Sequence, residues 1–433
     1  MARRHQAFAE QRINGQRASF KLCDLSDLDL SGRNLSAADF TGARLHGALL
    51  RGCDLRMATF YGADLAQADL MQANLTAADL RGTVLRGCIL MSANLSQADF
   101  RHGVLAMSQN GELLPLQESK VADLSKAVVV RANLTKARLS EGFIMQTDLR
   151  DADLRGAILA KADLSSSNLM GCDLTNADLS DANLEGANLE GAILTSALLR
   201  HANLRSCNLI GAILDGVDLS LADTADAALS GRVGVLQGDL DEILNHHAKW
   251  IETGGRAGKQ ADLSGMDLTG TDLSRRTLSA AIFRGAVLKN ANLSRSAVIM
   301  ADFSSADLRG CNLRNANLRG ARMIRANLGH ADLTGLLAGT INVQEHDWRT
   351  NWERARLNRA ILVGADLGGA TLTGADLRHA QLRNTNLERA DLTDANLGNA
   401  DLRGIRLAGA TLAGAKGIPD SVLESLDAME EWG

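Results

Sequence analysis

Large apolar residues recur at every fifth position along most of this 433-residue chain. Residues 177–191 show the pattern three times in succession: Ala, then Asp or Asn, then Leu, then two small or polar residues. We call the central Leu or Phe of each pentad position i. A period of five matches neither the 3.6-residue period of a helix nor the two-residue period of a flat strand. It predicts a chain that turns a corner every five residues, with positions i and i−2 inside and the other three outside.

The pentads form four blocks that are separated by breaks in the pattern. A single pentad cannot bury its own apolar residues, so the blocks must stack into a solenoid with a continuous core. This organisation predicts an all-β solenoid. Position i runs from residue 20 to 105, from 124 to 229, from 263 to 333 and from 357 to 412.

The phenylalanines indicate how many pentads make one coil. Phe20, Phe40 and Phe60 are each 20 residues apart, and so are Phe283 and Phe303. Aromatic rings stack well on one another, so like residues should recur once per coil. Twenty residues are four pentads, which predicts a quadrilateral cross-section and about 17 coils for the whole chain.

The breaks in the repeat predict loops, linkers and caps. Within residues 232–260, the apolar residues Leu240, Ile243, Leu244 and Trp250 are spaced as one face of a helix. We predict this order: an N-terminal helical cap (1–17), a β-helix (18–231) with a loop (106–119), a helical linker (232–260), a second β-helix (261–415) with an insertion (336–354), and a C-terminal capping helix (416–433).

The repeated phrase Ala-(Asp/Asn)-Leu-X-X resembles that of the pentapeptide repeat family, over about four-fifths of the chain. The resemblance implies a right-handed quadrilateral β-helix and says little about function. Some members are DNA mimics that bind DNA gyrase, a type II topoisomerase, and protect it against quinolones, which implies one candidate partner. Clear examples of the phrase are Ala63-Asp64-Leu65, Ala73-Asn74-Leu75, Ala162-Asp163-Leu164 and Ala395-Asn396-Leu397.

The chain offers no convincing catalytic, cofactor-binding or metal-binding residues, so we expect a protein that is not an enzyme. No nucleophile-elbow, P-loop, zincin or dinucleotide-binding motif stands in a fitting context. His5, His247 and His346 each lie near an aromatic residue, which we interpret as packing of a helix rather than as a site.

The six cysteines each stand two residues before an i position, where Ala is usual. We therefore interpret them as small buried apolar residues in a reducing, cytoplasmic protein. The start of the chain leads into no apolar run, and no stretch approaches 18 apolar residues, so we expect neither a signal peptide nor a membrane span.

Charge is distributed unevenly, although the chain as a whole carries only −5. Residues 160–230 hold three basic and ten acidic residues, whereas residues 275–325 hold ten basic and two acidic residues. Either block can be ordinary surface variation or a binding surface. The candidate acidic partner surface is Asp163, Asp173, Asp178, Asp181, Glu185 and Glu190. The candidate basic surface is Arg275, Arg284, Lys289, Arg295, Arg309, Arg314, Arg319 and Arg325.

Some outward positions are apolar, which can mark a protein contact or simply the β-propensity of branched residues. The candidates are Val84, Val104, Phe143, Ile193 and Ile213; the two valines are 20 residues apart, as are the two isoleucines. The sequence thus favours a rigid-rod scaffold for a protein partner of unknown identity, with a gyrase-binding DNA mimic as the alternative. Self-association is also open, and we expect no direct binding of nucleic acid.

Overall fold

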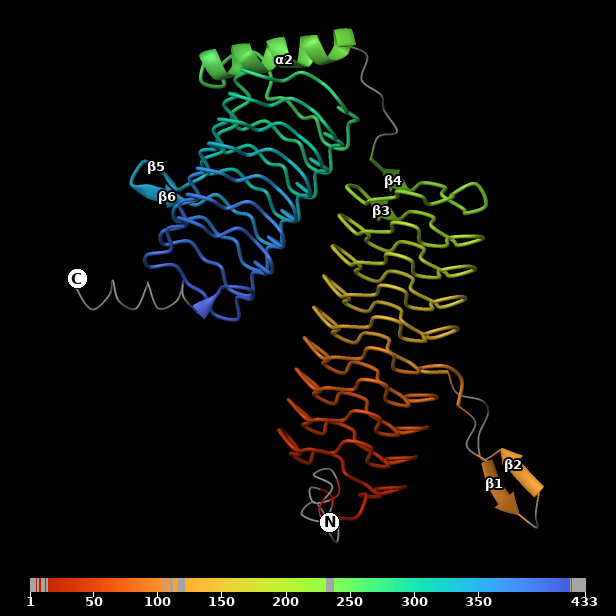
Figure 1. Ribbon diagram of the computed structural model, residues 1–433. Coiled ribbons are helices and arrows are strands. Elements are labelled where there is room, and N and C mark those ends of the chain that lie inside the picture. The colour runs from red at the N-terminus through yellow and green to blue at the C-terminus, as the bar shows by residue number, and fades with distance from the viewer. Residues whose placement is uncertain are drawn as a thin grey trace. The chain divides into compact units, whose positions relative to one another are not determined.

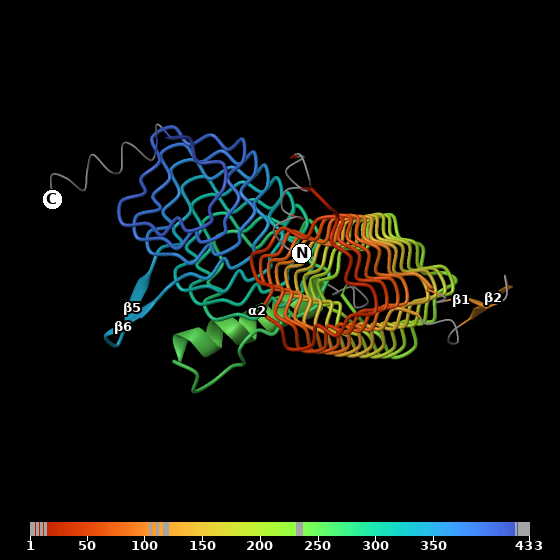
Figure 2. The ribbon, with the colours of Figure 1, turned by 90° about the horizontal axis from the view of Figure 1, so that it is seen from below.

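The computed structural model describes residues 5, 8, 12, 15–103, 106–109, 112–115, 121–230, 237–420 and 422. The chain divides into two compact units, residues 1–228 and 229–433. In each unit the chain winds into a stack of coils (Figure 1), and the end-on view shows successive coils lying over one another (Figure 2).

Each pentad is one short extended segment followed by a corner, as the pentad at Leu179 shows. The side chains of Ala177 and Leu179 are fully buried. The amide of Leu179 donates to the carbonyl of Leu198 in the next coil at 2.8 Å, and the amide of Asp178 donates to Ala157 in the preceding coil at 2.9 Å. The corner closes with the amide of Ala182 donating back to Leu179 at 3.1 Å. The small and large apolar positions therefore face inward, as predicted.

The corner requires a left-handed backbone at position i+2. Asp181, which occupies this position, has a φ of 58°, and the equivalent residue in most pentads is glycine or another residue with positive φ. Glycine reaches this conformation without a steric cost, whereas other residues need compensation from the surrounding hydrogen bonds. At Asp181 that compensation includes a 2.8 Å bond from its amide to the carbonyl of Arg200.

Parallel bridges connect residues that are 20 positions apart through most of both units. The phenylalanines stack accordingly: the ring centroids of Phe20 and Phe40 are 4.9 Å apart, those of Phe40 and Phe60 are 4.7 Å apart, and those of Phe283 and Phe303 are 4.5 Å apart. The predicted recurrence of aromatic rings once per coil is confirmed.

Two hairpins interrupt this register. Strands β1 (Ala106–Gln109) and β2 (Glu112–Pro115) pair antiparallel, and across them Val84 bridges Asp123, 39 positions away instead of 20. Strands β5 (Ile341–Val343) and β6 (His346–Trp348) form a second antiparallel hairpin, and there Arg322 bridges Asn351, 29 positions away. Trp352 follows as a fully buried core residue. The coils therefore continue past each hairpin.

Strands β3 (Asn208–Leu209) and β4 (Ala228–Leu229) pair near the end of the first stack. Helix α2 (Gln237–Glu252) lies at the start of the second stack (Figure 1). Leu240 and Leu244 of α2 are buried in the core of this unit, and Ile243 packs against it. The helix thus covers an end that would otherwise expose unpaired strand edges.

Candidate interaction surfaces

The Asp or Asn at position i−1 has a structural role at its own corner. Its Oδ1 accepts a hydrogen bond from the amide of residue i+1, as in Ser180 to Asp178 at 3.0 Å and Glu185 to Asn183 at 3.3 Å. Short polar side chains commonly stabilise turns in this way. Because an amide oxygen serves as well as a carboxylate, the choice between Asp and Asn sets the surface charge without changing the corner.

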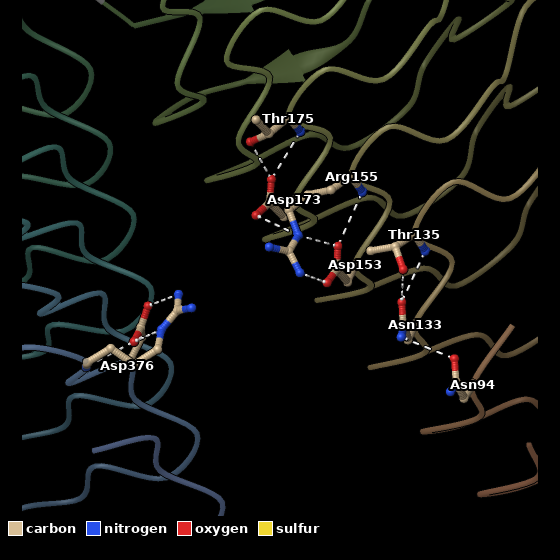
Figure 3. A network of polar contacts seen from close by, with 9 residues as sticks. Asn94, Asn133, Thr135, Asp153, Arg155, Asp173, Thr175 and Asp376 are labelled. Carbon is tan, nitrogen blue, oxygen red and sulfur yellow. Dashed lines mark hydrogen bonds and ion pairs between the residues drawn. The ribbon is translucent and has the colours of Figure 1, made fainter. Parts of the chain in front are cut away.

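Many of the carboxylates are neutralised by an arginine at position i+1. Arg56 contacts both oxygens of Asp54, at 2.8 and 2.6 Å, and this pairing holds the pKa of the Asp54 carboxyl below its ordinary value. Arg155 pairs with Asp153 in the same way and also lies 3.8 Å from Asp173 in the next coil (Figure 3). Arginine at position i+1 therefore offsets the charge of many of the aspartates at position i−1.

The six residues of the candidate acidic surface lie on several sides of the coils rather than on one side. Asp163, Asp173 and Asp178 are on three different columns of bridges, because residues of one column are 20 apart. Asp181, Glu185 and Glu190 occupy corners. Asn203 donates to Glu185 at 3.2 Å, and Asn208 donates to Glu190 at 3.5 Å. The structure therefore presents an acidic belt around these coils.

The candidate basic residues also lie at corners, and most have a carboxylate nearby. Arg284, for example, forms an ion pair with Asp302 at 2.7 Å. Arg275 and Arg295 differ, because neither has an ion-pair partner among the described residues. Of the remaining candidates, Arg325 makes interactions of its own, and four have ion pairs: Lys289–Asp307 (3.7 Å), Arg309–Asp307 (2.7 Å), Arg314–Asp332 (2.9 Å) and Arg319–Asp366 (3.9 Å).

The apolar candidates fall on different columns. Ile193 and Ile213 bridge each other directly, but Ile213 is only 5% exposed and offers a partner little surface. Val84 and Phe143 lie on one column, because each bridges Asp123, and Phe143 is 44% exposed. Val104 lies outside the described residues. Phe143 is therefore the most accessible of the described candidates.

The sequence did not single out a second apolar surface, which the β5–β6 hairpin creates. Trp348 is 50% exposed and Val343 is 36% exposed. The hairpin packs closely on the coil beneath it: a Cβ added at Gly320 would meet Ile341 at 3.0 Å. One feature of the sequence could have indicated this surface: Trp348 stands between two charged residues, Asp347 and Arg349, in a break of the repeat.

Two of the three singled-out histidines act at the start of a stack. The ring Nδ1 of His5 accepts a hydrogen bond from the Ala18 amide at 2.9 Å, and that of His247 accepts one from the Ala261 amide at 3.0 Å. Each ring also stacks on the aromatic residue three positions later, with centroids 5.7 Å apart. The packing interpretation is confirmed for both.

Burial lowers the pKa of His5 and His247, and carbonyl groups of the coils, at Ser36 and Ser279, act in the opposite direction. The packing interpretation is wrong for His346. This residue is exposed on strand β6, where its Nδ1 contacts the Gln344 carbonyl at 2.9 Å.

Five of the six cysteines are buried, as predicted, and Cys23 is exposed. Cys23 lies in the first coil of the first stack, where Leu22 and Leu28 are exposed as well. Burial raises the pKa of the Cys207 thiol to about 11 and that of Cys311 to about 12. These two thiols are therefore poor nucleophiles near neutral pH.

Within the described residues, no group of three or more His, Cys, Asp or Glu side chains is placed to hold a metal ion. The same part of the chain contains no helix with the length and apolar character needed to cross a membrane.

Comparison with known structures finds several repeat proteins. HetL, a pentapeptide repeat protein involved in heterocyst differentiation regulation in the cyanobacterium Nostoc sp. strain PCC 7120, is 26% identical; the match covers 78% of this chain and 89% of HetL, with a TM-score of 0.25. Rfr23 from the cyanobacterium Cyanothece 51142 is 32% identical over 34% of this chain and 90% of its own, with a TM-score of 0.19. QnrB1, a plasmid-mediated fluoroquinolone resistance protein, is 20% identical over 54% of this chain and 98% of its own, with a TM-score of 0.27.

No curated protein sequence matches the chain. Because the three TM-scores are low, the assignment to a family rests on the repeats themselves. The family model for pentapeptide repeats (8 copies) matches residues 18–56, 38–76, 68–105, 147–186, 182–220, 259–295, 301–335, 351–389 and 390–416. These matches cover well over half of the chain, and the protein therefore belongs to the pentapeptide repeat family, whose members fold as right-handed β-helices.

Proposed function

We propose that this protein is a non-catalytic rigid scaffold that binds a protein partner through the outer surface of its coils. Pentapeptide repeat proteins are generally structural or interaction proteins. The observation that carries the proposal is the fixed position of each outward residue. At Asp178, for example, the amide bonds the preceding coil while Oδ1 holds the corner, so the carboxylate is presented with little freedom. Preorganised groups lose less entropy when a partner binds.

The acidic belt at residues 160–230 is the partner surface that we favour. Its carboxylates have few basic neighbours: Lys161, Arg200 and Arg205 are the basic residues of this segment, and Arg155 from the preceding coil lies 3.8 Å from Asp173. Arg205 is itself paired with Asp223 at 3.2 Å. Uncompensated charge on a rigid surface steers a complementary partner and contributes to its specificity.

The test neutralises the belt without disturbing the corners. The variant carries Asp173→Asn, Asp178→Asn, Glu185→Gln and Glu190→Gln. Asn already occupies position i−1 in neighbouring pentads and makes the same corner bond, so the fold should persist. A matched control carries four Asp→Asn changes outside the belt, at Asp24, Asp29, Asp262 and Asp267, whose corners have the same bond.

Cross-linking and mass spectrometry in native extract would compare the two variants with the unmodified protein. We expect a specific protein to be captured by the unmodified chain and by the control, and to be lost from the belt variant. Equal capture by all three proteins would refute the acidic belt as the binding surface. A partner could instead be captured by both variants and lost when Trp348 or Phe143 is replaced. That result would assign partner binding to the exposed apolar residues.

The alternative is a DNA-mimicking binder of DNA gyrase or another type II topoisomerase. The acidic belt favours it, because a mimic of duplex DNA must present carboxylates where DNA presents phosphates. The bidentate arginines along the other coils oppose it, because they neutralise the aspartates there. A supercoiling assay with purified gyrase tests this function. If micromolar protein neither inhibits gyrase nor protects it against a quinolone, the DNA-mimic function is excluded.

We further propose the architecture that the repeats indicate: quadrilateral coils of four pentapeptides, about 17 in number. The bridges between residues 20 positions apart support it. The division into caps, two β-helices and a helical linker also stays a proposal, supported by the two compact units and by α2. Self-association of the protein with a second copy of itself is a further candidate interaction. A cytoplasmic location is proposed because all six cysteines are free thiols.

A further inference from the structure

A polar groove of about 480 Å³ lies at one corner of the coils in the second unit. Three arginines, three asparagines and two serines line it, and no carboxylate does. Such a lining is unusual in a chain where acidic residues outnumber basic ones. The arginines and asparagines of the lining are Arg275, Arg295, Arg314, Asn292, Asn312 and Asn315.

The backbone fixes two of these arginines one above the other. Arg275 and Arg295 both occupy position i+2 of the same corner, 20 residues apart, and both have a φ of 58°. The Arg275 amide donates to the Ser294 carbonyl at 3.0 Å, and the Arg295 amide donates to the Arg314 carbonyl at 2.9 Å. Neighbouring coils are spaced by about 4.8 Å, as neighbouring strands are. The backbones of the two arginines are therefore held at adjacent levels, and both residues line the same groove.

Asp272 holds position i−1 of the pentad that carries Arg275, but its Oδ1 accepts a hydrogen bond from the Asn292 side chain at 3.0 Å, and its carboxylate does not line the groove. At other corners an Asp at position i−1 pairs with arginine, as Asp307 does with Arg309. In the next two coils of this groove the position is Asn. Asn292 and Asn312 still make the corner bond, each at 3.2 Å, but carry no charge.

Neither Arg275 nor Arg295 has an ion-pair partner within the part of the chain that the structure describes. Arg314 contacts Asp332 through Nη1 at 2.9 Å and faces the groove as well. Adjacent like charges repel one another, and the amide groups of Asn292 and Asn312 cannot offset that repulsion. An anion in the groove would offset it.

We propose that this groove binds a phosphate dianion, carried either by free phosphate or by a phosphoserine side chain. The planar guanidinium group binds phosphate oxygens in pairs, with charge-assisted hydrogen bonds. A tetrahedral phosphate has three oxygens that accept hydrogen bonds, and it carries more negative charge than a carboxylate. The asparagine amides and serine hydroxyls supply further donors. The site does not depend on the acidic belt or on its partner.

The test uses the full chain and isothermal titration calorimetry at low salt. The probes are inorganic phosphate, a phosphoserine peptide and the same peptide without phosphate. The first variant, R275N/R295N, removes both charges, and Asn tolerates positive φ, so the corners should survive. The second variant, N292D/N312D, restores the carboxylates found at other corners and retains both arginines. The matched control is R359N/R389N, which removes two arginines with φ of 59° and 58° at corners outside the groove.

We expect the unmodified chain and the control to bind a phosphate probe saturably. Both groove variants should bind it at least tenfold more weakly. Tight binding of inorganic phosphate identifies a small-molecule source, and tighter binding of the phosphopeptide than of inorganic phosphate identifies a phosphoprotein. Absence of saturable binding by the unmodified chain for both phosphate probes would overturn the proposal. A loss in the control as large as in the groove variants would also overturn it, because the effect would then be nonspecific charge.

Discussion

Replacing His247 with alanine should loosen the start of the second coil stack. The ring is fully buried, its Nδ1 accepts from the Ala261 amide at 3.0 Å, and it stacks on Trp250. A buried amide that loses its acceptor costs about 1–3 kcal/mol, and an aromatic stack contributes about 0.5–1.5 kcal/mol. The expected cost is therefore about 2–4 kcal/mol for local opening.

Hydrogen exchange measured by mass spectrometry on the full chain can detect this change without a two-state assumption. A cost of this size should accelerate exchange of the Ala261 amide roughly 30- to 1,000-fold. The control is His246→Ala, which removes an exposed histidine from the same helix. Unchanged exchange at Ala261, or equal acceleration in the control, would refute the capping role of His247.

The same contact predicts a dependence on pH. Nδ1 can accept a hydrogen bond only in the neutral ring, and burial holds the pKa of His247 below its ordinary value of 6.5. A lowered pKa in the folded state means that the contribution is complete above about pH 6.5 and is lost as the pH falls from there through the folded-state pKa. Protection near Ala261 should fall with pH in the unmodified chain, and this decline should be weaker in His247→Ala.

Three further results are expected. Phe303→Ala should lower the free energy of unfolding by about 3–5 kcal/mol, because the ring is fully buried and stacks on Phe283 of the preceding coil. Hydrogen exchange should become faster in the coil of Phe303 and in the adjacent coils. A thiol reagent at pH 8 should react quickly with Cys23 and slowly with the buried thiols, since burial raises the pKa of Cys207 to about 11; equal rates for all six would contradict the core. Burial tends to raise the pKa of Asp302, but hydrogen bonds from a serine and an arginine outweigh it and lower the pKa. Its stabilising contribution should therefore be complete above about pH 4 and be lost as the pH falls further, which thermal melts at pH 2–5 can measure.

Much of the solenoid could be read from single residues. The alternation of Ala177 and Leu179 predicted which side chains face inward, because only a corner every five residues buries both. The 20-residue spacing of Phe283 and Phe303 predicted which rings stack. The inward side chains and the stacked rings could be predicted because each depends only on residues within one coil or two adjacent coils.

The surface could be predicted only in part. Which residues lie beside one another on it depends on the pairing of coils across the breaks in the repeat. Val84 bridges Asp123 although 39 positions separate them, and Trp352 rejoins the core directly after a hairpin. Neither the bridge nor the burial of Trp352 can be predicted from the five-residue period.

The sequence by itself therefore determined the repeat, the inward positions and the identity of the corner residues. The tertiary structure alone decided that the histidine rings accept the first amides of each stack, and that Arg275 and Arg295 share a groove without a carboxylate. The physical reason is that a five-residue period specifies the direction of each side chain, whereas its neighbours come from other coils.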